Sequence, residues 1–474
     1  MLGIELNREN ELQLWRQIYQ AMKELMVSGQ LEAGEVVPST RELAKELNVS
    51  RNTVCGAYDL LLSEGYLISS QGAFTRVADG LCMQSAEPVI SPKIKRQPAR
   101  PIAISFRTGR PDLSQFPRFL WQQLLHKASG ELSLETFGYT GPHGLPELRE
   151  EIAAWLFRSR GLKVSPDNIF ITAGATQGLH IIADILCGDS KNILMEDPCH
   201  LGMLGTFINK GCNIIPIPVD AKGMQTDYLS KCKSTGPIYV TPSHQFPLGG
   251  ILPASRRTEL IHFARENNLY IIEDDYDSEF RYGGETVAPM YTMDPQRVIY
   301  VGTFSKTVFP ALRIGYVILP YQLQARWHDL RTHTDVQNPP FEQAALAEFL
   351  RSRKLDRHIQ RMRKIYGYRR KLLLESLTEA FGNKCTAYGD CAGLHVAIDF
   401  PGMKFDEAFQ SNCLQKGLYV TPVENHCIEK GRHQNMLLIG YGHLEPDQIK
   451  RGVELLSGIM KDISFCDCNI TKHF

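Results

Sequence analysis

With 474 residues, the chain is too long for one ordinary hydrophobic core, and its length suggests about three domains. Its 52 Lys and Arg residues balance 52 Asp and Glu residues, so no overall charge draws the protein to nucleic acid or to a membrane, and DNA binding would need a local surface. A hydrophobic content of 43%, without a signal segment or an apolar run that could span a bilayer, leads us to expect a soluble, cytoplasmic protein with no membrane partner.

The first 78 residues predict a small domain of helices followed by a hairpin. Apolar residues recur at helical spacing over 12–29, 39–47 and 51–64. Two short apolar strands, 65–68 and 74–77, come next. This order of elements is that of a winged helix-turn-helix, whose third helix meets base edges and phosphates.

Sequence motifs strengthen this interpretation. Residues 10–78 closely resemble the GntR-type winged helix, because four of its motifs occur in order: Pro38-Ser-Thr-Arg-Glu-Leu-Ala, Val49-Ser-Arg-Asn-Thr-Val, Glu64-Gly-Tyr-Leu and Gln71-Gly. The resemblance implies binding to double-stranded operator DNA. The predicted contact residues are Arg41, Ser50, Arg51, Asn52, Thr53, Gln71 and Gly72.

The charge of this domain favours a different function. Residues 1–78 hold seven Lys or Arg against ten Asp or Glu, whereas DNA-binding domains are usually basic. A helical interaction module that never touches DNA therefore stays open as an alternative. Because a single weak module needs a second copy to bind tightly, the DNA interpretation predicts a homodimer.

The composition changes after residue 78. Residues 79–101 carry four prolines and four Lys or Arg with no apolar period, which predicts a semi-rigid, solvated linker. From 102 to 474, apolar strands alternate with helices, which is typical of an α/β domain with a mostly parallel sheet covered on both faces. The predicted strands are 169–172, 192–195, 213–217, 238–240, 269–272 and 298–301.

A lysine follows the last of these strands, in Val301-Gly-Thr-Phe-Ser-Lys306. A lysine in a dry pocket at a strand end can lose its proton and attack an aldehyde, and the nearby hydroxyls with Arg313 suit a phosphate. Aldehyde and phosphate on one ligand indicate pyridoxal 5′-phosphate (PLP). An ordinary surface lysine in a Thr/Ser loop explains this segment equally well when it is taken alone.

Two upstream motifs favour PLP. Gly174-Ala-Thr176 lies where a strand meets a helix, a place where backbone N–H groups hold phosphate. Asp274, in Glu273-Asp-Asp-Tyr276, follows another strand, and a carboxylate there can keep a pyridine nitrogen protonated. Each motif alone also fits a ligand-free turn or a helix cap. The twelve cysteines form no Cys-x-x-Cys pair, so we expect no metal site.

The second domain resembles the fold-type-I aminotransferases, and the whole chain resembles the MocR/GabR family of bacterial regulators, including its PdxR-like branch. The motifs are Tyr139-Thr-Gly-Pro-His-Gly-Leu-Pro-Glu-Leu-Arg149, Thr241-Pro-Ser-His-Gln-Phe-Pro-Leu-Gly249, Glu273-Asp-Asp-Tyr-Asp-Ser-Glu-Phe280 and Gly302-Thr-Phe-Ser-Lys306. The resemblance implies a PLP Schiff base on Lys306, with the pyridine nitrogen on Asp274 and the ring hydroxyl near Tyr276. The implied phosphate ligands are Gly174, Ala175, Thr176, Thr303, Arg313 and, from the partner subunit, Tyr139.

The sequence departs from the family at two ligand positions. His200 stands where a tyrosine usually stacks on the ring, and an imidazole stacks with less area. Leu438 stands where an arginine usually clamps the carboxylate of an amino acid. Arg432 or His433 is a poorer substitute in a loop, so the sequence favours PLP itself as the effector over an amino acid.

We therefore predict a homodimeric, PLP-dependent transcriptional regulator that senses a small molecule, PLP or an amino acid, in its aminotransferase-like domain. A working aminotransferase with an accessory DNA-binding domain is the first alternative, and a PLP-dependent lyase or racemase is the second. The missing clamp argues against efficient turnover, because transamination needs its substrates held in register over the lysine.

Overall fold

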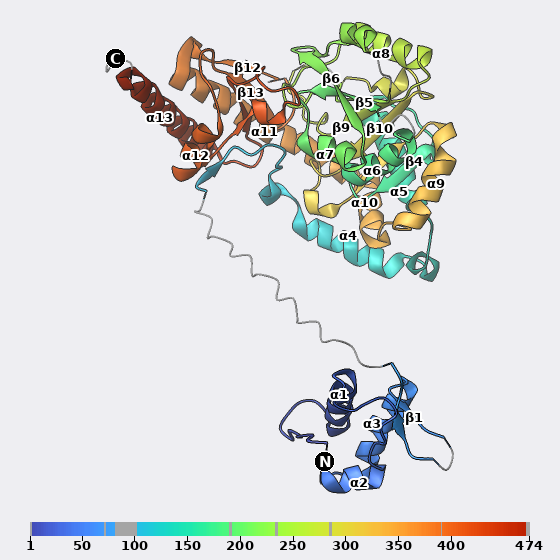
Figure 1. The fold of residues 1–474 in the computed structure, drawn as a ribbon. Helices are drawn as coiled ribbons and strands as arrows, with labels where there is room; N and C mark the ends of the chain where they lie inside the picture. Colours follow the sequence, from blue (N-terminus) through green and yellow to red (C-terminus); the bar gives the residue numbers. More distant parts are fainter. Residues whose placement is uncertain are drawn as a thin grey trace. The chain divides into compact units, whose positions relative to one another are not determined.

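The structure is a computed structural model that divides into two compact units, Met1–Pro98 and Ala99–Phe474 (Figure 1). It describes residues 2–70, 73–80, 102–188, 192–232, 236–283, 287–389 and 391–470. Gln71, Gly72 and most of the predicted linker lie outside the described residues. Within the described ranges, every helix is too short or too polar to cross a membrane.

The N-terminal unit has the predicted winged helix-turn-helix arrangement. Its elements are α1 (Leu14–Val27), α2 (Thr40–Glu46), α3 (Arg51–Ser63), β1 (Leu67–Ile68) and β2 (Arg76–Val77), with the two strands antiparallel. A small core holds them together, in which Ile18 and Met22 of α1 pack with Val54 and Leu61 of α3. The fold class predicted for this part of the chain is confirmed.

Helix α2 begins with a complete capping box. The Ser39 hydroxyl accepts the backbone N–H of Glu42 at 3.3 Å, and the Glu42 carboxylate accepts the backbone N–H of Ser39 at 2.8 Å. These bonds satisfy two donors that a short helix cannot satisfy internally. The hydrogen bond from the Ser39 backbone N–H stabilises the charged carboxylate and so lowers the pKa of Glu42.

Replacing Ser39 with alanine should therefore loosen α2 without unfolding the chain. Loss of such a cap costs about 1 kcal/mol, which corresponds to roughly fivefold faster amide exchange. Hydrogen exchange of Leu43 and Ala44 in the intact protein would measure it. Ser28→Ala is the matched control, because that hydroxyl only donates to Leu25 O at the end of α1. Equal exchange in both variants would contradict the prediction.

The C-terminal unit is built on an eight-stranded sheet with the order β4-β11-β10-β9-β8-β5-β6-β7. Its strands are β4 (Ile169–Thr172), β5 (Asn192–Asp197), β6 (Asn213–Asp220), β7 (Gly223–Met224), β8 (Ile238–Val240), β9 (Ile271–Asp275), β10 (Val298–Thr303) and β11 (Gly315–Ile318). All six predicted strands are present, although β9 begins two residues later than predicted and extends to Asp275. The sequence analysis did not predict β7 or β11, both of which run antiparallel to their neighbours.

Successive residues of the central strands face two separate cores. In β10, Val298 and Tyr300 belong to one core, while Ile299 and Val301 belong to the other. The first core includes residues of α5 (Pro146–Arg160), α8 (Ala254–Glu266) and α10 (Pro340–Arg351), and α4 (Arg118–Glu131) packs on α10. The second includes residues of α6 (Ala175–Leu186), α7 (Leu201–Asn209) and α9 (Tyr321–Thr334). Burial on both faces explains why these strands are continuous apolar runs rather than alternating ones.

A smaller antiparallel sheet with the order β12-β13-β16-β15 completes this unit. Its strands are β12 (Thr386–Tyr388), β13 (His395–Asp399), β15 (Thr421–Pro422) and β16 (Met436–Gly440). Beside it, β14 (Leu418–Tyr419) pairs with β3 (Ile104–Ser105), and the helices are α11 (Lys354–Phe381), α12 (Glu407–Gln415) and α13 (Pro446–Ile470). The first residue of β13, His395, lies in the wall of the cavity described next.

Candidate functional site

A cavity of about 290 Å³ lies where β9 and β10 end and where α6 and α7 begin. This is the edge at which ligands bind to open α/β sheets. Eight predicted site residues line it: Ala175, Thr176, His200, Asp274, Tyr276, Thr303, Lys306 and Arg313. Predicted Gly174 adjoins it through Arg313, whereas Tyr139 is almost fully exposed and is not part of its wall.

Lys306 reaches into the cavity from the loop after β10. Its Nζ donates a hydrogen bond to the carbonyl oxygen of Gly109 at 2.6 Å. Burial lowers the pKa of Lys306, and the carboxylates of Asp277 and Asp274 only partly oppose this effect. Gly109 has φ +69°, and a Cβ there would lie 3.0 Å from Nζ, so a larger residue would press on the amine.

Asp274 lies at the cavity floor in β9 and is 5% exposed. The Tyr239 hydroxyl donates to its Oδ2 at 2.6 Å. Its Oδ1 is buried and has no hydrogen-bond partner among the residues that the structure describes. Burial raises the pKa of Asp274 to about 6. A buried carboxylate oxygen without a partner is costly, so this atom is suited to a proton donor on a bound ligand.

The part of the cavity wall formed by Ala175, Thr176 and Arg313 suits an anion. Helix α6 begins there at Ala175, and its first backbone N–H groups carry a partial positive charge. The Arg313 guanidinium donates to Ala173 O at 2.6 Å. Gly174 has φ +85°, and a Cβ there would lie 2.7 Å from Arg313 Nη2. Glycine is therefore required for the guanidinium to approach the turn.

Two predicted ring contacts, His200 and Tyr276, are held by protein hydrogen bonds. His200 caps α7 through Nδ1, which accepts the Gly202 backbone N–H at 3.1 Å, and its ring meets Phe246 edge-on at 5.1 Å. Burial and the Lys306 charge lower the pKa of His200 to about 4, so the imidazole is neutral. The Tyr276 hydroxyl lies 3.0 Å from both the backbone oxygen and Nδ1 of His244.

Leu438, in β16, does not reach the cavity. It pairs with Ala397 and is fully buried among apolar side chains that include Phe246. Neither Arg432 nor His433 belongs to the cavity wall, and Arg432 forms an ion pair with Glu429. Of the described residues that line the cavity, Arg313 is the one with a guanidinium group.

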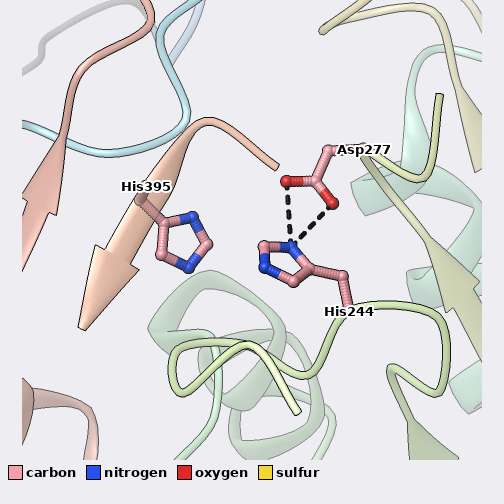
Figure 2. A group of neighbouring side chains, drawn as sticks. All are labelled: His244, Asp277 and His395. Atoms are coloured by element: carbon pink, nitrogen blue, oxygen red, sulfur yellow. Dashed lines mark hydrogen bonds and ion pairs between the residues drawn. The ribbon is translucent and has the colours of Figure 1, made fainter. Parts of the chain in front are cut away.

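Three further side chains meet beside the cavity and were missed by the sequence analysis: His244, Asp277 and His395 (Figure 2). One nitrogen or oxygen atom of each lies within 4.8 Å of the others. Among the described residues, these three side chains are therefore the group whose spacing could suit a metal ion. The available signal for two of them was their place in motifs quoted for the family resemblance, since His244 lies in 241–249 and Asp277 in 273–280. His395 lies in none of these motifs.

A buried glutamate holds the loop that carries His244 and Phe246. Glu196 Oε2 accepts the backbone N–H of Thr241 at 3.1 Å and its hydroxyl at 2.6 Å. Gln245 lies at the same carboxylate. Burial raises the pKa of Glu196 to about 7. Its hydrogen bonds fix the loop against the end of β5, and this places the Phe246 ring in the cavity wall with His244 behind it.

In the N-terminal unit, the predicted DNA contacts gather where α3 begins. Arg41, Arg51 and Asn52 are exposed, and Arg51 Nε donates to Thr40 Oγ1 at 3.3 Å. The Ser50 hydroxyl instead caps α3 by accepting the Thr53 backbone N–H at 3.2 Å, so its first role is structural. The predicted wing residues fall outside the described part of the chain.

Comparisons with known proteins match both units. A model described as "Aminotransferase class I and II" matches residues 106–456, and one described as "Bacterial regulatory proteins, gntR family" matches residues 14–77. The chain is 31% identical to the probable rhizopine catabolism regulatory protein MocR of Rhizobium meliloti, over 95% of this chain and 94% of that protein. It is also 31% identical to the pyridoxine biosynthesis regulator PdxR of Corynebacterium glutamicum, over 95% and 96%.

Solved structures match the C-terminal unit. An archaeal alanine:glyoxylate aminotransferase aligns with a TM-score of 0.71 and 26% identity, covering 76% of this chain and 91% of that one. A Pyrococcus horikoshii kynurenine aminotransferase, solved with PMP, aligns with a TM-score of 0.70 and the same identity and coverage. The chain therefore belongs to the MocR-type family of transcriptional regulators, in which a gntR-family winged helix is joined to a fold-type-I aminotransferase domain.

Proposed function

We propose that this transcriptional regulator binds operator DNA through its winged helix and binds PLP in the cavity of its aminotransferase-like domain, where the cofactor serves sensing rather than turnover. The observation that carries the proposal is the unpartnered, buried Oδ1 of Asp274 in the same cavity as Lys306 and Arg313. The regulatory names of the relatives and the PMP in a structural neighbour support it.

The cavity fits three separate features of PLP. The Lys306 amine would take the aldehyde, Asp274 Oδ1 would accept the proton of the pyridine nitrogen, and the turn before α6 with Arg313 would hold the phosphate. We assign Ala175, Thr176 and Thr303 to the phosphate end with them. PLP supplies an aldehyde that links to a primary amine and a ring that accepts electrons.

The chain's own residues prepare this site. Burial favours the neutral, nucleophilic form of Lys306, and the Gly109 carbonyl fixes the direction of its Nζ. Asp274, between the Tyr239 hydroxyl and the cavity, would hold a proton on the ring nitrogen. We place His200 against the ring face and Tyr276 near the ring hydroxyl.

A second copy of the chain would complete the site. Tyr139 and Leu134 are 89% and 87% exposed, and Phe119 and Phe137 are exposed as well. On α4, which carries Phe119, an apolar hollow of about 490 Å³ is lined by residues of that helix and of the loop after Lys306, including Trp121 and Phe309. Apolar side chains exposed together with an apolar hollow are typical of an interaction surface, whereas scattered single ones are not. They support a homodimer in which Tyr139 would bind the phosphate in the partner's site.

The effector is proposed to be PLP itself. An amino acid linked to PLP would need a cation for its carboxylate, and the wall away from the phosphate end offers Met203, Phe246, Leu394 and neutral imidazoles. A carboxylate buried there would lose solvation without gaining a partner.

Adding PLP to the apoprotein should therefore change DNA binding with no amino acid present. Operator DNA would be selected by the protein from random duplexes, and its affinity and footprint measured during a PLP titration. Typical coupling between two sites predicts a change of about 5- to 150-fold. Pyridoxal, which lacks the phosphate that Arg313 would bind, is the matched control. If PLP saturates the protein without effect and one amino acid then alters the footprint, the effector assignment is wrong.

A further inference from the structure

His244, Asp277 and His395 form a buried group against the cavity wall, drawn from three different parts of the chain (Figure 2). Each side chain belongs to a residue only 2% exposed. His244 lies in the loop after β8, Asp277 follows β9, and His395 opens β13. Asp277 and His395 also line the cavity that contains Lys306, whereas His244 lies behind them.

The Asp277 carboxylate is held by one ring nitrogen. His244 Nδ1 lies 3.0 Å and 3.2 Å from the two carboxylate oxygens, as Figure 2 shows. Its other nitrogen, Nε2, is buried and has no hydrogen-bond partner within the described residues. His395 Nε2 lies 3.3 Å from the backbone oxygen of Pro247. His244 and Asp277 therefore form a hydrogen-bonded pair, and His395 lies beside this pair.

Glycines allow this close packing. Gly393 has φ +78°, and a Cβ there would lie 2.2 Å from His244 Cε1 and 2.6 Å from Asp277 Oδ2. Gly249 has φ +75°, and a Cβ there would lie 3.1 Å from His244 Nε2. The backbone thus encloses the imidazole on two sides and leaves it little freedom to turn away from Asp277.

The charges of this group differ. Burial lowers the pKa of His244, but the Asp277 carboxylate and the Gly389 backbone together more than offset burial, so the pKa is raised, with Arg281 acting in the opposite direction. The pKa of His395 is lowered well below its ordinary value by burial and by His244. The Asp277 carboxylate therefore favours the protonated form of His244, whereas burial and His244 favour the neutral form of His395. The Tyr276 hydroxyl also faces His244 Nδ1.

Lys306 faces several titratable groups across the cavity. They are Asp274 and Asp277 from the end of β9, His200 from the start of α7, His395 from β13 and Arg313 from the turn before β11. Of the two carboxylates, Asp277 opposes the burial of the Lys306 charge more strongly than Asp274 does. Asp274 is engaged by Tyr239 and is assigned to the ligand, so Asp277 is the remaining carboxylate of the cavity wall that can act on the amine.

We propose that Asp277 is the counter-charge of Lys306 and that His244, by holding and partly neutralising Asp277, sets the pH at which the Lys306 amine becomes reactive. Asp277 and His244 are then positioning residues that act through the lysine. The role of this arrangement in PLP binding rests on the proposed function. The electrostatic effect of Asp277 and His244 on the Lys306 amine does not require PLP. A metal ion is the competing occupant, but it would have to displace the hydrogen bonds between His244 and Asp277.

Competitive acetylation of the full-length chain, freed of PLP, measures the inference directly. A trace of acetic anhydride reacts only with neutral amines, and mass spectrometry of the Lys306 peptide across pH gives the midpoint of its ionisation. Two isosteric variants remove one charge each. Asp277→Asn keeps an oxygen for His244 Nδ1, and His244→Asn keeps a donor at the Nδ1 position and cannot be charged.

The two variants should shift the Lys306 midpoint in opposite directions. Asp277→Asn removes the stabilising carboxylate and should lower the midpoint by about one pH unit, a tenfold gain in neutral amine at a given pH. His244→Asn leaves the carboxylate without its cation and should raise the midpoint by about as much. General loosening of the fold would expose the amine and raise the midpoint in both variants.

A surface carboxylate serves as control. Asp220→Asn breaks an ion pair with Arg256 away from the cavity and should leave the midpoint unchanged. Unchanged midpoints in both test variants, or shifts in the same direction, would overturn the inference. So would stoichiometric Zn²⁺ binding that is lost in His395→Ala, because the group would then be a metal site. If the midpoints move as expected but PLP never links to Lys306, the proposed cofactor fails and the charge coupling stands.

Discussion

Lys306→Ala should abolish the covalent attachment of PLP. The parent protein should show a near-ultraviolet to visible absorption band that borohydride reduction removes, leaving the label on Lys306. The variant has no other amine at that place, since Nζ of Lys306 alone reaches Gly109 O in the described cavity. Absorption spectra before and after reduction, with peptide mass spectrometry, would measure the loss. Basal DNA binding should persist, because the winged helix is a separate unit.

Lys210→Ala is the matched control for this experiment. Lys210 forms an ion pair with Asp184 at the end of α7 and does not line the cavity. Its loss should leave both the absorption band and the label in place. A Lys306→Ala protein that kept the same reducible band would show that the cofactor is held elsewhere, and would remove the assignment of the cavity.

Arg51→Ala should weaken operator binding strongly while leaving the cofactor untouched. Arg51 is exposed at the start of α3, where its Nε donates to the Thr40 hydroxyl, and the two terminal nitrogens of its guanidinium are available for phosphate or guanine. Loss of such a contact costs roughly 1–3 kcal/mol, about 5- to 150-fold in affinity. Gel shifts at several salt concentrations would measure both the affinity and the salt dependence.

The control lies on another face of the same unit. Arg16 is exposed on α1, where it packs over the ring of Trp15. Arg16→Ala should bind like the parent. Equal affinity and an equal salt slope for Arg51→Ala and the parent would mean that α3 is not the recognition helix. A loss that is the same for both variants would indicate a diffuse charge effect instead.

The sequence predicted those parts of the fold in which a single pattern, such as a short apolar run, marks the element. Strand β8 was predicted with its observed bounds, because a buried parallel strand is a short apolar run with clear limits. Strand β11 was missed, since Gly315–Ile318 begins two residues after Arg313 and looks like the end of a ligand loop. The small sheet was missed because its strands pair across long separations, such as Val396 with Ile439, which no local pattern reports.

The residues of the candidate site also fall into a predicted group and a missed group. Lys306, Asp274 and Arg313 follow or end strands within recognisable motifs, and the structure brings them into one cavity. Gly109 is 197 residues away from Lys306 in the sequence, and His395 reaches the cavity from a sheet that was not predicted. Only the tertiary fold brings such residues to the cavity, so no local sequence pattern predicts them.

Pro310 lies in the wall of both the ligand cavity and the apolar hollow that we assign to the second copy. In the proposed homodimer, filling one site would stabilise the backbone that the other needs. Any factor that the cofactor added to self-association would then return to the cofactor's affinity. The cellular abundance of the proposed PLP sensor would enter its own sensitivity: a scarce protein would release PLP more readily than an abundant one, so gene dosage and vitamin supply would act on the same equilibrium.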